Sequence, residues 1–594
     1  MAAATGSVLS EKLWRPMAAA AGSTLSEKLW RPMAAATGSA LSEKLWRPMA
    51  AAAGSALSEK LWQPMAAAMG SALSEKLWRP MAAATEGTLM IEQEITLTQI
   101  LTAREERVAI QNVLLGEYKA PVISFTMNIA GPVKVTALSH RAFLWGMEQL
   151  RLGFLQNQMQ VLKEVSRSLP TGDEGYFAVD APAERIKALC VEIEEGDRYL
   201  GRLFDMDVIG TDGRKLERDS ERPCIVCGKP GRDCASRRLH SVAELQRATA
   251  SDLKNGLLFL DRDRIAGLAT RALLEEVAVT PKPGLVDRAN NGSHKDMDFF
   301  SFQASAAGLS AYWGQCFYEG AWRTVVQADD AAPTSAEAFA ALRPLGKIAE
   351  RRMLSATGGV NTHKGAIFTL GVLCGAIGRL WTAEEGFPDT EAILNEAAAM
   401  TRETLEKELP AAHWNTAGEA LYQKYGARGI RGQVADGLPA VREISLPVFQ
   451  KLLAGGLDRN HAAAVTLLHL IANVEDTNLL HRGGPKGAAW ARDAAAALLA
   501  ACRDEPRSSG IRNECNLPQA NPNDRPPAKD CPTDDCLLCK PDKQGLSLHA
   551  ERPWRVPSLE EIADLDRQFI QRNLSPGGCA DLLAVTLFLE SLQD

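Results

Sequence analysis

The sequence predicts a multidomain protein in which an α+β domain is followed by a mostly all-α domain, with a weakly structured repeat tail in front of both. Three observations lead to this prediction. The chain begins with five copies of a 16-residue unit, mixed strand and helix signals follow from about Met90, and the signals become almost wholly helical after Asn255. We therefore expect a tail over residues 1–85, an α+β domain over 90–252 and a helical domain over 256–594.

Composition and charge exclude several classes of protein. The 594 residues include 66 Lys and Arg against 73 Asp and Glu, a net charge of −7, so there is no overall basic field for nucleic acid. The longest apolar run, 365–378, is shorter than the roughly 18 residues that a bilayer span needs, and no export signal is recognisable. We expect a cytoplasmic protein that binds neither nucleic acid nor a membrane.

The repeat tail consists of units close to MAAAxGSxLSEKLWRP. Each unit has a short stretch with helical spacing of apolar residues, but a proline interrupts the hydrogen-bond ladder every sixteen residues. Solenoid repeats usually run 20 residues or more and contain a paired element that buries a face. We therefore favour a weakly structured tail without a role in chemistry over a solenoid.

The α+β domain opens with a helix predicted over 100–115 and a strand predicted over 121–129. The strand ends in a turn, Asn128–Lys134. In this turn Gly131 permits a close backbone approach, and the ammonium group of Lys134 is a point charge suited to phosphate. The turn is a candidate phosphate contact, although this signal is weak when taken alone.

A carboxylate pair stands on the strand predicted within 200–209, where residues alternate with period two. Phe204, Met206 and Val208 are expected to face the core. Asp205 and Asp207 then lie side by side on the other face and repel each other unless a divalent cation sits between them. Mg²⁺ fits, because it prefers one or two carboxylates together with phosphate oxygens and water. A solvated strand face with two Asp residues explains the pattern equally well.

A cysteine cluster follows the carboxylate pair. Cys224, Cys227, Cys234 and His240 offer three thiols and an imidazole within 17 residues, a plausible tetrahedral Zn²⁺ set. Simple reduced cysteines are an equally good reading of the same spacing.

Together, the turn at 128–134, the segment 201–207 and the cysteine segment 222–240 resemble the apo-citrate lyase phosphoribosyl-dephospho-CoA transferase family, over about residues 90–250. The resemblance implies that a prosthetic group is attached to a serine of the citrate lyase acyl carrier protein and that pyrophosphate is released. It implies that Asp205 and Asp207 bind the metal, and it suggests Arg202 as a phosphate-binding residue.

Five polar islands interrupt the helical domain. The first begins with Thr280–Asp287, in which two prolines stiffen the loop around Lys282, and continues over Gly292–Asp298. We expect Ser293 to cap a helix on which His294 and Asp298 share a face. The acidic side chains of Asp287, Asp296 and Asp298 are candidate Mg²⁺ ligands. Alternatively, acidic residues in a first helical turn simply complement the helix dipole.

The second island, 358–365, precedes the long apolar run, which we read as a buried core helix. Glycines that lead into a helix N-terminus leave backbone N–H groups free to bind phosphate, and Lys364 adds positive charge. The candidate nucleotide-binding residues here are Gly358, Gly359, Asn361 and Lys364, with His363 beside them. A glycine turn with an Asn or Thr cap is the alternative.

The last three islands add charge. Tyr425–Gly432 is predicted to be a flexible loop in which Arg428 and Arg431 suit an anion. Residues 475–478 end an apolar helix, and Arg482 follows them. Charged groups such as Asp476 at the end of an apolar helix need a partner, so we favour binding of a metal or a substrate there over a solvated helix end. Residues 575–583 combine a glycine turn with a restarted helix.

The five islands, in order, resemble the triphosphoribosyl-dephospho-CoA synthase family over about residues 260–594. The resemblance implies that the 2′-hydroxyl of dephospho-CoA is joined to C1 of the ribose of ATP and that adenine is expelled. Such a displacement passes through an oxocarbenium-like state, which calls for carboxylates, a proton acceptor, a proton donor and a triphosphate clamp. We assign Asp287, Asp296, Asp298 and Asp476 to the carboxylates or metal ligands, Lys364 and Arg431 to phosphate, and His294 or His363 to proton transfer.

The stretch 503–557 departs from the family pattern and is predicted to be an insertion. It carries Cys515, Cys531, Cys536, Cys539 and His549, and a disordered loop is favoured over a zinc-stapled one.

The two resemblances predict a bifunctional enzyme that makes and then installs the citrate lyase prosthetic group, using ATP, dephospho-CoA and Mg²⁺. Fusing both enzymes raises the local concentration of the shared intermediate. Two alternatives remain open at this stage. The same chemistry can serve malonate decarboxylase, or the chain can be a binding or assembly protein without catalytic activity.

Overall fold

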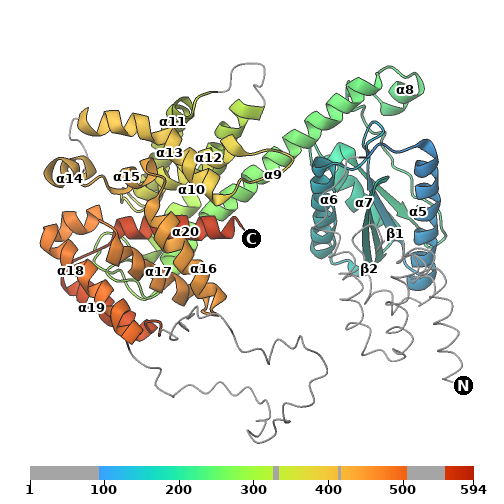
Figure 1. The fold of residues 1–594 in the computed structure, drawn as a ribbon. Coiled ribbons are helices and arrows are strands. Elements are labelled where there is room, and N and C mark those ends of the chain that lie inside the picture. Colours follow the sequence, from blue (N-terminus) through green and yellow to red (C-terminus); the bar gives the residue numbers. More distant parts are fainter. Residues whose placement is uncertain (1–92, 326–332, 412–416, 505–554, 594) are drawn as a thin grey trace, which may run out of the picture. The chain divides into compact units, whose positions relative to one another are not determined.

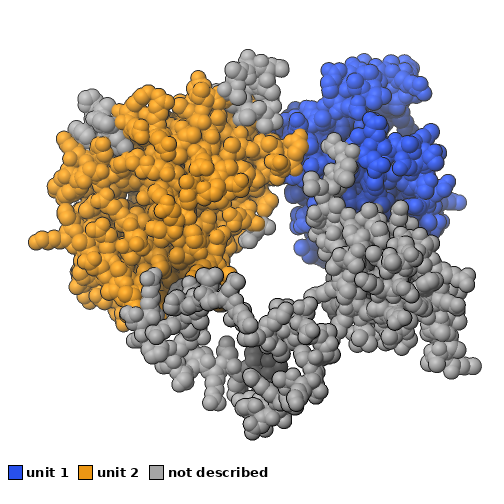
Figure 2. Space-filling view, viewed as in Figure 1, with its two compact units in different colours: residues 1–259 blue, residues 260–594 orange. Residues whose placement is uncertain are grey.

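The computed structural model describes residues 93–325, 333–411, 417–504 and 555–593. The predicted repeat tail and the cysteines and histidine of the predicted insertion lie outside these residues. The chain divides into two compact units, residues 1–259 and 260–594, coloured separately in Figure 2. The division falls within helix α9 (Val242–Ala278), and each unit is described by itself.

Unit 1 is built on a four-stranded antiparallel sheet in the order β2-β3-β1-β4. The strands are β1 (Val122–Met127), β2 (Gln160–Leu169), β3 (Gly172–Asp180) and β4 (Phe204–Ile209). The strands predicted over 121–129 and within 200–209 are therefore both present, as β1 and β4. Strand β4 lies at one edge of the sheet, so one of its sides pairs with no other strand among the described residues.

Helices cover both faces of this sheet. Helices α6 (Ala137–Gln156) and α7 (Ala183–Gly196) lie on one face, and α5 (Leu97–Tyr118) lies on the other, as Figure 1 shows. On the α6 face, the rings of Phe125 and Phe143 stack with centroids 5.0 Å apart. Helix α5 contains the predicted helix 100–115 and is longer at both ends. The side chain of Thr96 caps its first turn, which sets the earlier start.

Strand β4 shows the predicted alternation. Phe204, Met206 and Val208 are fully buried against the α7 side, whereas Asp205 and Asp207 point to the other face with side chains 44% and 29% exposed. After β4, a short helix α8 (Gly231–Ser236) precedes α9. A single 3-10 turn, η2 (Gly201–Leu203), leads into the strand.

The described residues of unit 2 form helices and loops, without a strand. After α9 come α10 (Phe299–Val325), α11 (Ser335–Ala356), α12 (Lys364–Leu380), α13 (Thr390–Ala411), α14 (Ala417–Tyr425), α15 (Gly429–Ala435), the π-helical turn η3 (Ala440–Ser445), α16 (Leu446–Ala454), α17 (Arg459–Asn473), α18 (Thr477–Asp504), α19 (Leu559–Gln571) and α20 (Gly577–Ser591). The α+β and mostly helical parts of the predicted fold are thus confirmed.

Helix α12 is the centre of unit 2, and twelve of its seventeen residues are buried, as predicted for the apolar run 365–378. Its glycines allow α10 to pack closely. A Cβ atom added at Gly378 would lie 2.0 Å from the carbonyl oxygen of Phe317, which no side chain can tolerate. None of the described helices combines the length and apolar character that a membrane span requires.

Candidate active sites

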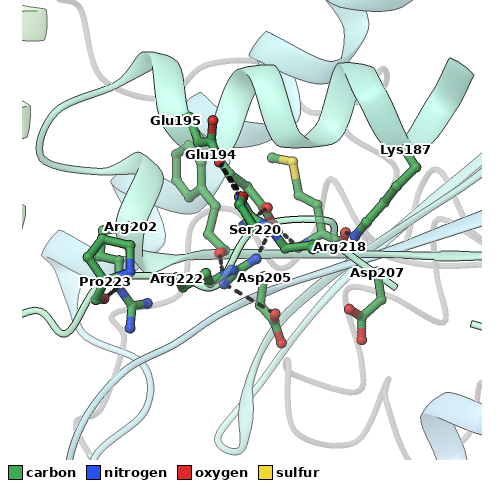
Figure 3. Close-up of polar contacts among 12 residues, drawn as sticks. Lys187, Glu194, Glu195, Arg202, Asp205, Asp207, Arg218, Ser220, Arg222 and Pro223 are labelled. Atoms are coloured by element: carbon green, nitrogen blue, oxygen red, sulfur yellow. Dashed lines mark hydrogen bonds and ion pairs between the residues drawn. The ribbon is translucent and has the colours of Figure 1, made fainter. Parts of the chain in front are cut away.

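The carboxylate pair of unit 1 belongs to a polar stripe that crosses two strands. In the antiparallel register Asp205 lies opposite Thr126 of β1, and Asp207 lies opposite Ser124. Directly opposed residues point to the same face of a sheet, so these four side chains share one surface. The two Asp side chains also point to the same side in Figure 3.

Two basic side chains approach the pair. Nη1 of Arg222 is 3.4 Å from Oδ1 of Asp205, and Nζ of Lys215 is 2.6 Å from Oδ1 of Asp207 (Figure 3 shows the Arg222 contact). The described residues supply no partner for the second oxygen of either carboxylate. The pair is therefore charge-compensated on one side and keeps two oxygens available for a metal ion or a hydrogen-bond donor.

A buried carboxylate behind the pair fixes these arginines. Glu194, 5% exposed, accepts a hydrogen bond from the backbone N–H of Met206 at 2.8 Å and forms ion pairs with Arg218 and Arg222. Burial raises the pKa of Glu194, and the two guanidinium groups oppose that rise. Sequence reasoning missed Glu194, since an acidic residue near the end of an amphipathic helix is usually solvated.

The two predicted phosphate-binding residues of this unit contact the backbone. Nζ of Lys134 donates to the carbonyl oxygen of Ile129, and Nε of Arg202 donates to that of Pro223. Burial, and then the charge of Arg104, lowers the pKa of Lys134. Gly131 has φ +94°, and a Cβ added there would collide with the side chain of Gln246, so this turn does require glycine.

Cys224, Cys227, Cys234 and His240 come together as predicted from their spacing. Their ligand atoms all lie within 4.8 Å of one another. Within the part of the chain that the structure describes, no other group of three or more His, Cys, Asp or Glu side chains is arranged to hold a metal ion.

Unit 2 contains a cavity of about 650 Å³, lined by residues from helices α9, α10, α11, α12, α15, α18 and α20 and from the loops between them. Eight of the predicted site residues line it: Lys282, His294, Asn361, His363, Lys364, Arg428, Arg431 and Arg482. Residues of all five polar islands therefore converge on one space.

Six predicted residues do not line the cavity: Asp287, Asp296, Asp298, Asp476, Gly358 and Gly359. The buried Asp287 instead holds its own loop, because its carboxylate accepts from the backbone N–H groups of Lys282, Ala289 and Asn290. Gly358 and Gly359 both have positive φ and form the turn ahead of α12.

The predicted helix that begins at Ser293 is wrong. Helix α10 begins at Phe299, and Asp298 is the residue that caps it, accepting from the N–H and the hydroxyl of Ser301 at 2.8 and 2.6 Å. The hydroxyl of Ser293 donates instead to the carbonyl of Leu574, 2.7 Å away. The cap was therefore misplaced by five residues, since either residue type can occupy that position.

Asp476 is buried, and backbone groups hold both of its carboxylate oxygens. Oδ1 accepts from the N–H groups of Asn478 and Leu479, and Oδ2 accepts from that of Cys579 at 2.8 Å. Burial raises the pKa of Asp476, and these three hydrogen bonds oppose the rise. The side chain thus links the start of α18 to α20.

His294 lies in the cavity wall between two polar partners. Nδ1 is 3.1 Å from Nη2 of Arg482, and Nε2 is 2.9 Å from the hydroxyl of Ser575. A guanidinium group can only donate, so Nδ1 accepts and Nε2 carries the proton. Burial, and then the charge of Arg482, lowers the pKa of His294 to about 4. The ring is therefore neutral near pH 7.

His363, immediately before α12, is 4% exposed and also lines the cavity. Its Nδ1 is 2.7 Å from the hydroxyl of Ser305, while its buried Nε2 has no hydrogen-bond partner among the described residues. Burial, and then the charge of Lys282, lowers the pKa of His363 to about 3. A buried nitrogen without a partner is costly unless a ligand or water satisfies it.

Three acidic residues of the cavity were not predicted as site residues: Glu276, Asp581 and Glu350 of α11. Glu276 of α9 is 4% exposed and lies 2.5 Å from Nζ of the buried Lys282. Asp581 of α20 is half-buried and stands against the N-terminus of α12, where a Cβ added at Gly365 would lie 1.8 Å from its Oδ2. Burial, and then the charges of Glu276 and Asp476, raises the pKa of Asp581 well above its usual range.

The loop predicted over 425–432 is partly helical, because α15 begins at Gly429. Arg428 forms an ion pair of 2.6 Å with Asp436, and Lys364 lies 3.3 Å from Glu350, which also lines the cavity. Apart from Asp581, nothing in the sequence distinguished the acidic cavity residues, whereas the position of Asp581 in the fifth island was a usable signal.

Comparison with known proteins defines the class. Residues 95–256 match the family model of apo-citrate lyase phosphoribosyl-dephospho-CoA transferase. Residues 262–521 and 547–594 match that of ATP:dephospho-CoA triphosphoribosyl transferase. The interruption between them, 522–546, falls inside the predicted insertion. The chain is therefore a transferase with two catalytic parts, one in each unit.

Individual relatives agree with both matches. The chain is 33% identical over 520 residues to Protein CitXG of Haemophilus influenzae, covering 86% of this chain and 98% of the relative. It is 29% identical to Protein CitXG of Leuconostoc mesenteroides over 84% of this chain and 98% of that protein. It is 39% identical to a probable 2-(5″-triphosphoribosyl)-3′-dephosphocoenzyme-A synthase of Citrobacter koseri, over 56% of this chain and 91% of the relative.

The chain belongs to the CitXG family. It is a bifunctional enzyme, a triphosphoribosyl-dephospho-CoA synthase and an apo-citrate lyase phosphoribosyl-dephospho-CoA transferase, and ATP and dephospho-CoA are its substrates. Both predicted activities are thereby confirmed. The alternative of a binding or assembly protein without catalytic activity is therefore rejected.

Proposed function

We propose that the cavity of unit 2 is where the 2′-hydroxyl of dephospho-CoA displaces adenine from C1 of the ribose of ATP. The new bond joins C1 to the hydroxyl oxygen, the bond from C1 to adenine breaks, the hydroxyl loses its proton, and the purine gains one. The observation that supports this most is one cavity that combines acidic Glu276 and Asp581 with basic Lys364, Arg428 and Arg431. The acidic groups suit the oxocarbenium-like state, and the basic groups suit the triphosphate.

Asp581 is our candidate for the proton donor to adenine. Its raised pKa keeps the carboxyl protonated at pH values at which an exposed Asp is ionised, and a general acid needs that proton. The backbone N–H of Ala366, at the start of α12, hydrogen-bonds the carboxyl group and opposes the rise in its pKa. That contact also stabilises the carboxylate that remains after proton transfer.

His363 is our candidate for the group that accepts the hydrogen bond of the attacking hydroxyl. Its Nε2 lacks a partner, and the ring is uncharged near pH 7, so this nitrogen is available as an acceptor when Nδ1 carries the proton toward Ser305. His294 is then a positioning residue, since both of its nitrogens are already engaged by Arg482 and Ser575.

Lys364, Arg428 and Arg431 are our candidates for binding the triphosphate, together with the N-terminus of the seventeen-residue helix α12. The predicted magnesium ligands Asp296, Asp298 and Asp476 do not line the cavity, and the oxygens of Asp476 are held by backbone N–H groups. We therefore propose that Mg²⁺ reaches this site bound to the triphosphate of ATP.

In unit 1 we propose that Asp205 and Asp207 hold the Mg²⁺ needed for transfer to the carrier protein. The serine oxygen forms a bond to the phosphorus nearest the ribose, the bond from that phosphorus to pyrophosphate breaks, and the serine proton leaves to solvent or a base. The ion would neutralise charge on the phosphates. The two partner-free carboxylate oxygens fit such an ion, and Arg222 and Lys215 add positive charge beside them.

The experiment uses the full chain with Mg²⁺, ATP and dephospho-CoA. Free adenine, measured by chromatography, should appear in an amount equal to the triphosphorylated product. Adding the apo acyl carrier protein of citrate lyase should then give a carrier protein whose mass has increased by the complete prosthetic group. Preferential modification of the malonate decarboxylase carrier protein, offered in parallel, would contradict the choice of carrier, and absence of adenine would contradict the cavity chemistry.

A further inference from the structure

The cysteine cluster of unit 1 plays no part in the chemistry proposed above. Sγ of Cys227 lies 3.5 Å from Sγ of Cys234 and 3.3 Å from Nε2 of His240. The four ligand atoms all lie within 4.8 Å of one another, and the three cysteines are free thiols.

These separations fit a tetrahedral metal ion better than a disulfide. Zn²⁺ with bonds of about 2.3 Å to sulfur and about 2.0–2.1 Å to nitrogen separates two sulfurs by about 3.8 Å and a sulfur and a nitrogen by about 3.5 Å. A disulfide instead requires two sulfurs about 2.05 Å apart. The two closest contacts at Cys227 are therefore about 0.2–0.3 Å shorter than in a zinc site, and no pair of ligand atoms is more than about 1 Å too far apart for one.

The backbone of the segment turns to present the ligands. Gly228, with φ +70°, follows Cys227, and its N–H donates to the carbonyl of Cys224 at 2.9 Å. The N–H of Cys224 in turn donates to the carbonyl of Lys229 at 2.7 Å. This tight turn brings two thiols together, α8 supplies the third, and His240 closes the set just before α9 begins.

The same segment has almost no apolar core of its own. Cys224 and Cys234 are buried, at 7% and 6% exposed, but Val226 and Leu239 are exposed. A segment of this length without an apolar core is ordinarily held together by a metal or a disulfide. The segment is also tied to the carboxylate pair, because the carbonyl of Arg222 accepts from the N–H of Gly231, at 3.0 Å.

We propose that Cys224, Cys227, Cys234 and His240 bind one structural Zn²⁺ ion, and that this ion holds the segment that places Arg222 beside Asp205. Arg222 stands two residues before the first ligand. Its guanidinium group also donates to the carbonyl of Phe204 at 2.7 Å and pairs with Glu194. Loss of the ion would loosen the segment that carries this arginine, so that its contacts with Glu194 and Phe204 would have to hold it alone, and it would not affect the cavity of unit 2.

The test measures zinc in the full chain, purified without chelators from zinc-supplemented medium, by plasma mass spectrometry. Cys227→Ser should lose one zinc ion per chain relative to the unmodified protein, because Cys227 is an exposed ligand whose replacement leaves the apolar core intact. Two matched controls, Cys374→Ala in the core of unit 2 and Cys536→Ser in the predicted insertion, should lose none of this zinc. Unchanged zinc in Cys227→Ser would overturn the proposal.

A second measurement keeps the proposal testable if Cys227→Ser folds poorly. Removing the metal from the unmodified chain with a chelator should make trypsin cleave at Lys229, Arg232 and Arg237 at least about tenfold faster, and added zinc should restore protection. Once the chelator has been removed and Mg²⁺ has been supplied again, transferase activity of the zinc-free chain should be about tenfold lower, whereas adenine release should not change. Cleavage that does not respond to the metal, or a Cys227–Cys234 disulfide found by peptide mass spectrometry, would contradict the zinc site.

Discussion

Asp205 and Asp207 stand on an edge strand of unit 1 with side chains 44% and 29% exposed, whereas Glu276 and Asp581 line a cavity within the helices of unit 2. The open pair is charge-compensated by neighbouring basic side chains. The enclosed acids instead have raised pKa values, because burial disfavours their charged forms. This difference in exposure fits the substrates of the two reactions. A serine on a carrier protein needs an accessible surface, while a sugar cation needs a site that excludes water.

The largest effect we expect is from Asp581→Asn, which removes the proposed proton donor and keeps the size of the side chain. Adenine release should fall by about 10³-fold, within the range that general acid catalysis contributes. Transfer of ready-made triphosphoribosyl-dephospho-CoA to the carrier protein should remain unchanged, because that reaction belongs to unit 1. Both rates can be measured on the same preparation, by chromatography of adenine and mass spectrometry of the carrier protein.

The matched control is Asp564→Asn, which removes an exposed carboxylate of α19 that pairs with Arg567 on the surface. It should leave both rates within twofold. Equal losses in the two Asp variants, or a loss of less than fivefold in Asp581→Asn, would show that the carboxyl group of Asp581 does not donate a proton.

The second prediction concerns the open site. Asp207→Asn should reduce transfer to the carrier protein by about 100-fold, because a neutral amide binds Mg²⁺ poorly, and it should leave adenine release unchanged. Raising the Mg²⁺ concentration should recover part of the activity. Asp212→Asn, at a side chain 62% exposed just beyond β4, is the control. If Asp207→Asn instead keeps a high transfer activity that does not depend on Mg²⁺, the two Asp residues do not bind a metal. They are then better explained as a solvated strand face.

The contrast between the sites also explains what could be predicted from the sequence. Alternation within 200–209 was enough to place Asp205 and Asp207 on one face, because strand periodicity is local. The cavity depends on helices far apart in the chain, so Glu276, on an ordinary helical stretch, gave no local signal. Asp287 was expected to bind Mg²⁺ together with Asp296 and Asp298, and Asp476 was expected to bind a metal or a substrate because a charge at the end of an apolar helix needs a partner. In the structure the partners are backbone N–H groups, which sequence patterns do not reveal.

The third prediction uses pH. His294 has a pKa near 4 in the folded protein, whereas an unfolded chain protonates its histidines near pH 6.5. Between these two pKa values the unfolded state binds more protons than the folded state. The free energy of unfolding therefore falls as the pH drops from 6.5 toward 4, and His294 has little effect on it above pH 6.5. Between pH 7 and pH 5, the free energy of unfolding of the unmodified protein should fall by ~1.5 kcal/mol more than that of His294→Gln.

Urea unfolding followed by circular dichroism at both pH values measures this difference. The acidic residues with raised pKa values act in the opposite direction, but they are common to both proteins and cancel in the comparison. Equal losses in the two proteins would mean that His294 is protonated in the folded state, which is incompatible with the hydrogen bond that its Nδ1 accepts from Arg482.

The smallest effect we expect is from Lys364→Gln in the cavity wall. Lys364 pairs with Glu350 at 3.3 Å, with side chains 47% and 39% exposed, and exposed pairs of this kind add little stability. The variant should therefore fold normally and raise the KM for ATP by about tenfold through loss of one phosphate contact, with a smaller change in kcat. Lys347→Gln, an exposed lysine of α11, should leave the KM unchanged. If the two lysine variants behave alike, the triphosphate lies elsewhere in the cavity, nearer Arg428 and Arg431, and those two arginines are the ones whose replacement should then raise the KM.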